Sequence, residues 1–429
     1  MSNIENESAE FAVNCNPGTT AKSSPHPDKH QAKGHGKAML NRIRAAHLAG
    51  KPKKTRHLIR IYLNSHAAHL AATHLARRSL RAHRHFPEAL VSVIAAGLDP
   101  WAGTTEEVRV SYIPKGSDRD DRRTTMEFGP ENKALQYLVL SVLKVVAGLH
   151  PHQFGTGNGG PHAAIKHIAQ AMKDGFVWTI EIDIENCFAS FDGKKIIDLL
   201  PIPKGVTERV LLPVHLNLVP GNLIDLFGTM SGGVHSHTPH NTPFGPAGDL
   251  GPGGAQILAE ARQGLAQGSA TSALLAEMLL SVSLKEVPNL GPVFGYADNF
   301  VVMAKSENDV VTMTKALGSS LKGHPAGPLR PKMKGFFPAG DPVEVLGHRL
   351  IGGPGAIKIE ASPANLAEFE LQMKKGVFSL RKPGLSPGAR SKKAQHLARK
   401  LHGWVSAFRL CHDAELYKVH WLAKIADCS

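Results

Sequence analysis

The sequence predicts an α+β protein, because strand patterns and helix patterns fall in separate parts of the chain. From Trp178 to Ile184, apolar residues alternate with Thr179, Glu181 and Asp183, which is typical of a strand with one apolar and one carboxylate-bearing face. Two apolar runs, 293–294 and 300–303, flank a short acidic turn and predict a tight hairpin. Toward both ends of the chain, apolar residues recur at helical spacing instead.

The first part of the chain divides into a tail and a helical segment. Residues 1–35 are rich in Ser, Asn, Pro, Gly, Lys and His and have almost no apolar periodicity, so we expect them to be disordered. Residues 36–104 predict a helical extension that is broken at Gly50-Lys51-Pro52. The apolar residues at helical spacing are Met39, Leu40, Ile43, Leu48, Leu58, Ile59, Ile61, Tyr62, Leu63, Leu70 and Leu75.

Positive charge is concentrated in this helical segment. The chain of 429 residues has a formal net charge of +14, and the stretch 29–87 contains fourteen Lys or Arg and no Asp or Glu. The rest of the chain is therefore balanced. Such an asymmetry is the footprint of a polyanionic partner, and the alternative is a solvated basic face on a helical domain.

Residues 105–128 predict a pair of strands joined by the polar turn 116–121. A glycine-containing loop follows at 153–160; its glycines would let the backbone approach a ligand, although a plain loop has the same composition. Residues 228–255 are rich in Gly, Pro and His and predict irregular structure. Three histidines there invite a metal interpretation, but no Cys or carboxylate completes the set, which favours a flexible loop. They are His235, His237 and His240.

Two carboxylates are candidates for a metal site. Asp183 lies at the end of the predicted strand, and Asp298 lies at the tip of the predicted hairpin. If strand and hairpin pair, the two side chains converge, and two such carboxylates hold a pair of divalent cations about 4 Å apart. That geometry is typical of phosphoryl transfer. The alternative for Asp298 is an ordinary turn residue.

Three blocks of sequence resemble the motifs of reverse transcriptases, in the same order. Asp183 and Phe188 match motif A, residues 263–275 resemble motif B, and Tyr296-Ala297-Asp298-Asn299 is similar to motif C. Residues 113–136 resemble the fingers motif and the helix after it, and 332–348 are similar to motifs D and E. The resemblance is to bacterial reverse transcriptases of the group II intron-like and defence-associated lineage, and it runs from about residue 36 to the C-terminus.

This resemblance implies a right-hand polymerase fold. Fingers and palm would occupy residues 105–355, and a helical thumb would occupy residues 356–429. The thumb interpretation agrees with the residues themselves, since Ser362-Pro363 is a helix start and 371–412 contains ten Lys or Arg and no acid. A solvated helical tail is the alternative.

The resemblance also implies a metal site and a nucleotide site. Asp183, Asp298 and the main-chain carbonyl of Ile184 would bind two Mg²⁺ ions. Lys115 and Arg123 would hold the triphosphate of the incoming nucleotide, with Arg122 as the competing choice because the turn length leaves the register uncertain by one. All three cations are alternatively surface charges beside a hairpin.

Further roles follow from the same resemblance. Phe188 would act as a steric gate against the ribose 2′-hydroxyl, or it is a core phenylalanine. Gln267 and Gly268 would pack under the nascent base pair, at the start of an amphipathic helix. Lys334, with Lys332 as its competitor, would protonate the leaving pyrophosphate.

Asn299 departs from the family pattern, which usually has a second aspartate at this place. An amide is a neutral oxygen donor and binds a hard cation more weakly than a carboxylate does. We expect activity to persist, with Mn²⁺ as a possible replacement for Mg²⁺. A catalytically impaired, polymerase-like RNA-binding scaffold is the alternative that Asn299 favours.

The function predicted from the sequence is RNA-directed DNA polymerisation in the cytoplasm, with an RNA template, a DNA product and dNTPs as partners. Four scattered cysteines argue against a disulfide framework, and neither a signal peptide nor an apolar run of about 18 residues is evident. By elimination among the family's branches we expect a role in antiphage defence, with a dedicated non-coding RNA or a partner protein. A group II intron-type maturase is the alternative role.

Overall fold

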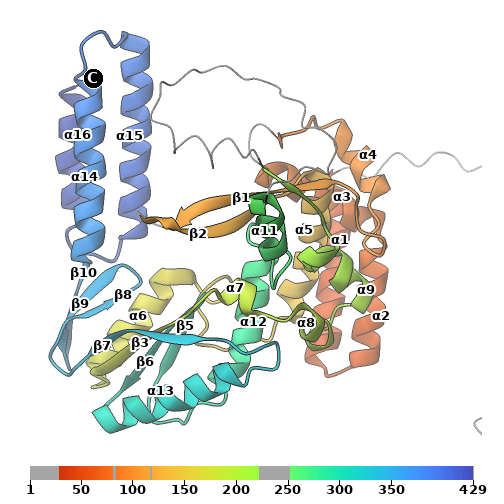
Figure 1. The fold of residues 1–429 in the computed structure, drawn as a ribbon, viewed down its shortest axis with the longest axis horizontal. Helices are drawn as coiled ribbons and strands as arrows, with labels where there is room; N and C mark the ends of the chain where they lie inside the picture. The colour runs from red at the N-terminus through yellow and green to blue at the C-terminus, as the bar shows by residue number, and fades with distance from the viewer. Residues whose placement is uncertain (1–28, 81–83, 116–117, 222–251, 429) are drawn as a thin grey trace, which may run out of the picture.

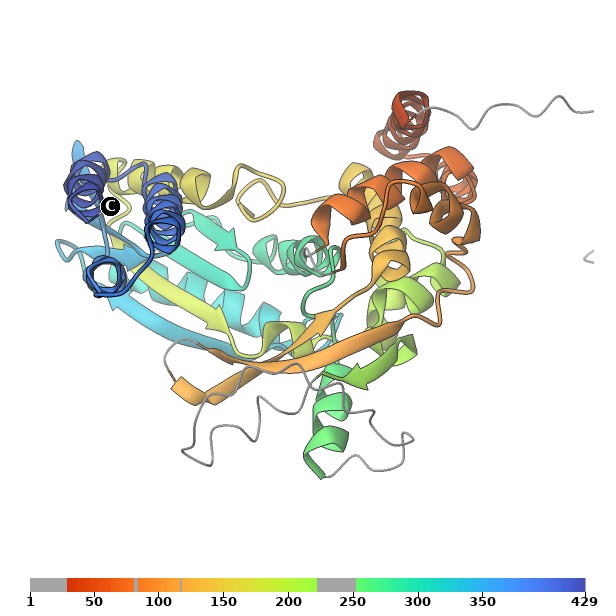
Figure 2. The same cartoon turned by 90° about the horizontal axis from the view of Figure 1, so that it is seen from above.

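The computed structural model describes residues 29–80, 84–115, 118–221 and 252–428 (Figure 1). The chain forms mixed helix and sheet, as predicted. The N-terminal helices lie at one end, the C-terminal helices lie at the other, and the sheets lie between them (Figure 2). Within the described residues, no helix is both long enough and apolar enough to cross a membrane.

Five helices make up the N-terminal end. They are α1 (Lys29–Leu48), α2 (Pro52–Leu63), α3 (His66–Ser79), α4 (Leu90–Gly97) and α5 (Pro130–Val146). The predicted break at residues 50–52 separates α1 from α2, where Gly50 has a φ of 63° and Pro52 opens the next helix. The prediction of disorder is wrong for residues 29–35, which form the first turns of α1, and residues 1–28 lie outside the described part.

A four-stranded antiparallel sheet forms the centre, in the order β5-β6-β3-β7. Its strands are β3 (Trp178–Ile184), β5 (Val293–Tyr296), β6 (Asn299–Ala304) and β7 (Pro331–Phe337). The predicted hairpin is confirmed, because β5 and β6 pair around a two-residue turn. The predicted pairing of the strand with the hairpin is confirmed as well, since Trp178 lies opposite Ala304 and Asp183 opposite Asn299.

Helices cover the apolar faces of this sheet. Alternate residues of β3 and β6 are buried in one core with α5, α12 (Ser272–Leu284) and α13 (Glu307–Lys322). The intervening residues of β6 pack with α6 (Gly160–Lys173) in a second core. The prediction of an amphipathic helix after Gly268 is wrong, because α12 is buried on nearly every side, including Glu277.

A second sheet has the order β2-β1-β4, formed by β1 (Glu107–Lys115), β2 (Asp118–Glu127) and β4 (Asn217–Pro220). The strand pair is confirmed, but the turn was predicted too long, since residues 118–121 belong to β2. Most of the Gly/Pro/His-rich segment, with His235, His237 and His240, lies outside the described residues. Its last residues begin α11 (Pro252–Ala261), so the irregular segment was also predicted too long.

The C-terminal part combines a small sheet and three helices. The sheet has the order β10-β9-β8, formed by β8 (Val343–Val345), β9 (His348–Gly353) and β10 (Ala356–Ala361). The helices are α14 (Pro363–Leu380), α15 (Pro387–Ala407) and α16 (Ala414–Ala426). The helix start at Ser362-Pro363 is confirmed, because the Ser362 hydroxyl caps α14 by accepting from the Asn365 amide.

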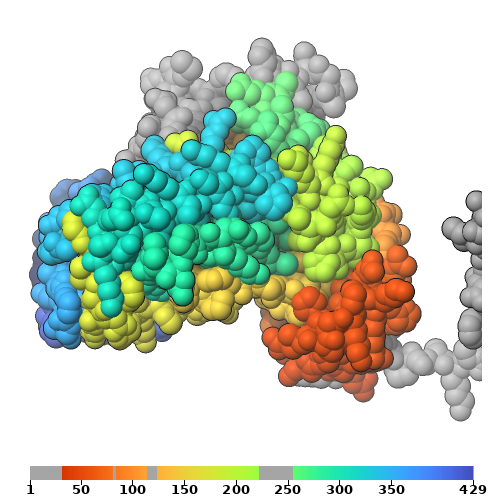
Figure 3. Space-filling view, turned by 90° about the horizontal axis from the view of Figure 1, so that it is seen from below, coloured from red at the N-terminus to blue at the C-terminus, as the bar shows by residue number. Residues whose placement is uncertain are grey.

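Shorter helices connect these parts. They are α7 (Cys187–Ser190), α8 (Gly193–Leu199), α9 (Lys204–Val206), the π-helical turn η2 (Thr207–Leu211) and the 3₁₀ turn η3 (Pro213–His215). Seen from below, the N-terminal helices gather into a lobe at the end of the molecule opposite the blue C-terminal helices (Figure 3).

Candidate active site

Strand β3 and the β5–β6 turn bring the two candidate carboxylates together. Asp183 is the penultimate residue of β3, and its register partner Asn299 directly follows Asp298. The turn is fixed to the strand by a hydrogen bond that the Ile184 amide donates to the Asp298 carbonyl at 3.2 Å. The convergence predicted from sequence is therefore present.

The environment of Asp298 disfavours its ionised form. Burial, together with the negative charge of Asp183, raises the pKa of Asp298, while the ammonium of Lys334 opposes the shift. Burial likewise raises the pKa of Glu181, which projects from the same face of β3. Both shifts have burial as their largest cause, with the charge of Asp183 acting in the same direction.

Lys334 and Asn299 connect the two acids. Lys334 Nζ lies 3.2 Å from Asp183 Oδ1 and donates a hydrogen bond to Asn299 Oδ1 at 3.0 Å. Asn299 Nδ2 in turn donates to Asp298 Oδ1 at 3.3 Å. Of the two lysine candidates, Lys334 is thus the one at the acids, because Lys332 pairs with Glu185 at 3.5 Å.

A β-bulge explains this choice of lysine. Along β7, Met333 faces Ile182 and Gly335 faces Glu181, so Lys334 is the extra residue between two register positions. Bulged residues leave the regular alternation of a strand and redirect a side chain. The bulge is what turns Lys334 toward Asp183 and Asn299.

A cavity of about 720 Å³ opens beside the acids. Arg123 on β2, Phe188 on α7 and Gln267 line it together with Asp183, Asp298, Asn299, Ile184 and Lys334. Phe188 is half-buried, and its carbonyl accepts a hydrogen bond from the Leu265 amide at 2.8 Å. One cavity therefore collects eight of the ten residues predicted for the site.

Of the two other predicted residues, Lys115 has a side chain outside the described part, and Gly268 is not among the residues that line the cavity. The side chains of Lys115 and of the competing Arg122 lie outside the described part, and their backbones sit at the far end of the β1–β2 pair. Gly268 lies behind Gln267, with a φ of 104°, and a Cβ there would come within 2.4 Å of the Met126 carbonyl oxygen. Its role is therefore to let strand β2 approach closely.

The donor set fits a magnesium-type cation bound jointly with a substrate. In the described part of the chain, no three His, Cys, Asp or Glu side chains come close enough together to hold a metal ion. Mg²⁺ keeps several waters and is bound through one or two carboxylates plus substrate phosphates, so Asp183 and Asp298 suffice. Burial and the charge of Asp183 disfavour the ionised form of Asp298, and a bound cation would relieve this cost.

The structure adds features that the sequence did not reveal. Asn186, three residues after Asp183, has a φ of 49°, and Ala297, directly before Asp298, has a φ of 51°. Left-handed backbone at non-glycine residues costs about 1–3 kcal/mol and clusters at functional sites. A left-handed residue therefore lies directly before Asp298 and another lies three residues after Asp183, and neither has a signature in a single sequence.

A loop in which Gln153 and Phe154 are buried supports the turn from behind. The Gly295 amide donates to the His152 carbonyl at 2.8 Å, and the Phe154 amide donates to the Gly295 carbonyl at 2.7 Å. Gln153 Nε2 donates to the Ala297 carbonyl at 3.3 Å. The loop is anchored by Glu277, whose two carboxylate oxygens accept from the Thr156 amide at 2.8 Å each.

Comparison with known proteins gives distant likenesses. No protein-family model matches the chain, and no curated protein matches it. Telomerase from Candida albicans, in complex with a TWJ fragment of telomeric RNA, aligns at 8% identity and a TM-score of 0.34, over 80% of this chain and 62% of that chain. Apo telomerase from Candida tropicalis, truncated from its C-terminal domain, aligns at 11% identity and a TM-score of 0.32, over 60% and 55%.

This chain therefore spans less than two thirds of either telomerase chain. Likeness at these TM-scores carries no argument about function. The function proposed below is argued from the residues of the site.

Proposed function

We propose that this protein is an RNA-directed DNA polymerase that extends a primer by nucleotidyl transfer. The observation that carries the proposal is the convergence of Asp183 and Asp298 at a cavity also lined by Arg123, Phe188 and Gln267. These residues come from four separate segments of the chain. The central sheet would be the palm, the β1–β2 pair would belong to the fingers, and α14–α16 would form the thumb.

Each side chain has a role suited to its place. Asp183, Asp298 and the Ile184 carbonyl would hold two Mg²⁺ ions, which activate the primer 3′-hydroxyl and neutralise charge on the triphosphate when bound. Arg123 would bind the triphosphate by charge-assisted hydrogen bonds. Phe188 would crowd a ribose 2′-hydroxyl, and Gln267 would lie under the nascent base pair.

Lys334 would deliver a proton to the leaving pyrophosphate. In the absence of substrate, its ammonium lies against Asp183 and Asn299. A triphosphate entering the cavity would offer it a stronger anionic partner, and the ammonium would then be placed to act as a general acid. Asn299 would accept a hydrogen bond from this ammonium when no triphosphate is bound, without adding a negative charge.

The test is primer extension with labelled dNTPs, an RNA template, and Mg²⁺ or Mn²⁺. We expect incorporation by the wild type, loss of incorporation in Asp183→Asn, and full activity in Asp341→Asn, a control at an exposed aspartate. Incorporation by Asp183→Asn would place the chemistry elsewhere. No incorporation with either metal, by protein that still retains RNA, would favour the scaffold.

A catalytically impaired RNA-binding scaffold is the second candidate. The observation that favours it is the internal ion pair, since the Lys334 ammonium already neutralises Asp183 where a cation would bind. Lys334→Ala separates the two candidates. If the protein is a polymerase, Lys334→Ala abolishes dNTP incorporation and leaves nucleic-acid binding intact. If it is a scaffold, the substitution changes neither incorporation nor nucleic-acid binding.

Within the polymerase class we propose a role in antiphage defence, with a group II intron-type maturase as the alternative. The support for this role is the sequence, in which the other branches of the reverse transcriptase family are eliminated. Phage challenge of a bacterial host that expresses wild-type protein or Asp183→Asn tests it. Protection by the wild type alone supports defence, whereas equal plaque counts contradict it.

A further inference from the structure

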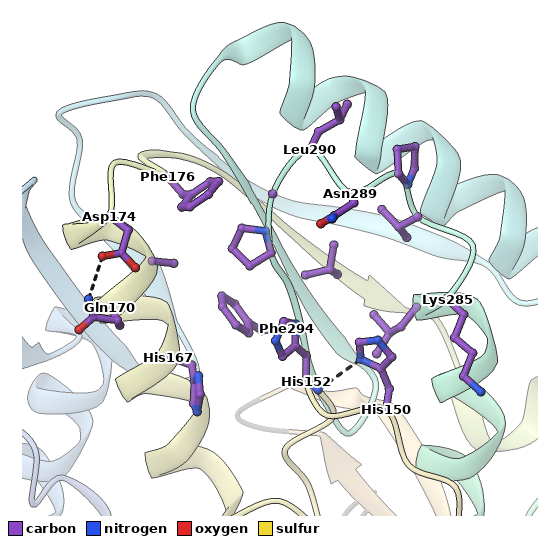
Figure 4. Close-up of a pocket in the computed structure, with 17 residues that line it drawn as sticks. His150, His152, His167, Gln170, Asp174, Phe176, Lys285, Asn289, Leu290 and Phe294 are labelled. Carbon is purple, nitrogen blue, oxygen red and sulfur yellow. Dashed lines mark hydrogen bonds between the residues drawn. The ribbon is translucent and has the colours of Figure 1, made fainter.

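A second cavity lies on the flank of strand β5 and shares no lining residue with the active-site cavity (Figure 4). Its walls are helix α6, the segment 150–152 and the segment 284–294. Its volume is about 610 Å³, within the range of about 300–1,000 Å³ that is typical of small-molecule sites.

Flat rings form the floor and one wall of this cavity. The imidazole of His152 lies 5.2 Å from the Phe294 ring, and that of His167 lies 6.3 Å from it, measured between centroids. Phe176 faces them across the cavity (Figure 4). Phe294 is only 4% exposed and backs the other rings, so stacking contacts to a planar heteroaromatic group come from the more accessible rings of His152, His167 and Phe176.

Polar groups stand at the rim. The amide of Asn289 offers both a donor and an acceptor, and Gln170 Nε2 donates to Asp174 Oδ1 at 2.9 Å, which leaves other lone pairs of that carboxylate available. These groups match the hydrogen-bonding edge of a nucleobase. At the other end, next to His150, the ammonium of Lys285 supplies positive charge suited to a phosphate.

The imidazoles of His150 and His152 favour the neutral form, which offers hydrogen-bonding atoms without a positive charge. Burial, and then the charges of His152 and Lys285, lower the pKa of His150, and burial lowers the pKa of His152. A transition metal is the obvious alternative ligand for three histidines, but in the described residues no such group comes close enough to bind one. The rings therefore favour an organic ligand.

We propose that this cavity binds a nucleoside phosphate, with its base among the accessible rings of His152, His167 and Phe176 and its phosphate at Lys285. Among the described residues, Asp174 is the one carboxylate that lines the cavity, so the cavity has no carboxylate pair to hold a divalent cation. We therefore expect binding without a divalent cation. The ligand is an effector and not the polymerised substrate.

Occupancy would reach the active site through strand β5. Phe294 forms the floor of the cavity, and the next residue, Gly295, exchanges main-chain hydrogen bonds with His152 and Phe154. A base stacked on His152 therefore contacts the segment that pairs with Gly295, three residues before Asp298. This regulatory consequence rests on the proposed function, whereas the binding itself does not.

Equilibrium dialysis of the full chain against radiolabelled ATP, and separately GTP, in EDTA tests the proposal. We expect about one nucleotide per chain, with binding weakened about tenfold or more by Lys285→Ala and by Asn289→Ala. Asp183→Asn and Arg123→Ala should bind as the wild type does. Lys322→Ala, an exposed lysine on α13, is the matched control.

Two results would overturn the proposal. One is the absence of binding of either nucleotide in EDTA by folded protein. The other is binding that Arg123→Ala abolishes and Lys285→Ala leaves intact, which would place the nucleotide in the active-site cavity. Metal-independent binding by a protein that never incorporates dNTPs would refute the proposed function and leave this inference standing.

Discussion

At the scale of single residues, the pair Asp183–Asp298 costs stability in the absence of a cation. Because the pKa of Asp298 is raised, the folded state takes up a proton at a pH where the unfolded chain is still ionised. The free energy of unfolding therefore falls as pH rises through that interval. Above it, the full cost of the ionised pair is present.

Asp298→Asn removes this cost. We expect the variant, measured by denaturant unfolding in EDTA at pH 7, to gain about 1 kcal/mol, while incorporation falls about a thousandfold. The Asn side chain still accepts the hydrogen bond from Asn299, so packing is preserved. A variant less stable than the wild type at pH 7 would contradict the electrostatic explanation.

Asn299→Asp tests the departure from the family pattern. It removes the Nδ2 donor to Asp298 and adds a third negative charge, so we expect a loss of about 1 kcal/mol of stability in EDTA. Because a carboxylate binds a hard cation more strongly than an amide, the ratio of incorporation in Mg²⁺ to that in Mn²⁺ should rise. An unchanged ratio would show that residue 299 has no part in cation binding.

The positions of the two acids could be predicted from the sequence, whereas the arrangement of the residues around them could not. Asp183 and Asp298 lie at the ends of strongly patterned strands, where strand pairing alone brings them together. Lys332 and Lys334 could not be distinguished, because two lysines two positions apart share a face in a regular strand. The bulge at Lys334 and the strained backbone at Asn186 and Ala297 depend on tertiary packing.

At the scale of secondary-structure elements, Glu277 links helix α12 to the loop behind the catalytic turn. The residue is 2% exposed, burial raises the pKa of its carboxyl, and hydrogen bonds from Thr156 oppose that shift. The sequence did not predict this link, because residues 153–160 have no periodicity and Glu277 lies within an apolar helix. A buried carboxylate surrounded by Leu residues was the available signal.

Glu277→Ala should loosen this loop. It leaves the Thr156 amide without its acceptor and opens a void, so we expect a loss of about 2–4 kcal/mol in free energy of unfolding. Incorporation at a temperature where the variant is folded should fall through kcat, with KM for dNTP nearly unchanged, since Arg123 and Phe188 are untouched. Glu286→Ala, an exposed acid just beyond α12, is the control. A change confined to KM would contradict a role in supporting the turn.

At the scale of the whole molecule, the sequence shows that positive charge is concentrated near the N-terminus, and the structure shows which of those cations are exposed. Many cations of α1 and α2 are exposed, among them Lys53, Lys54 and Arg56, and they lie in the lobe formed by the N-terminal helices. Others are used internally, since Arg77 pairs with Glu88 and Arg84 with Glu127. The helical character of this region could be predicted from periodicity, but the start of α1 and the division between exposed and paired cations could not.

Removal of positive charge from this lobe should weaken the binding of nucleic acids of any base sequence. For Lys53, Lys54 and Arg56 changed together to Gln, we expect lower affinity for every RNA tested and a salt slope reduced by about 0.7–0.9 per lost phosphate contact. Filter binding between low and moderate salt measures both quantities. The matched control changes Lys305, Lys315 and Lys322, and an equal loss of affinity there would mean that the lobe has no special role.

The order of the central sheet has a consequence for biosynthesis. Strand β3 leaves the ribosome long before β6 and β7, the two strands that pair with it on either side. The apolar residues Ile180, Ile182 and Ile184 belong to a strand with two open edges until residue 304 has emerged, and with one open edge until residue 337 has emerged. An open strand edge is a template for aggregation. The nascent chain therefore needs shielding during a long interval of translation, and slow synthesis between residues 184 and 337 should lower the yield of folded protein.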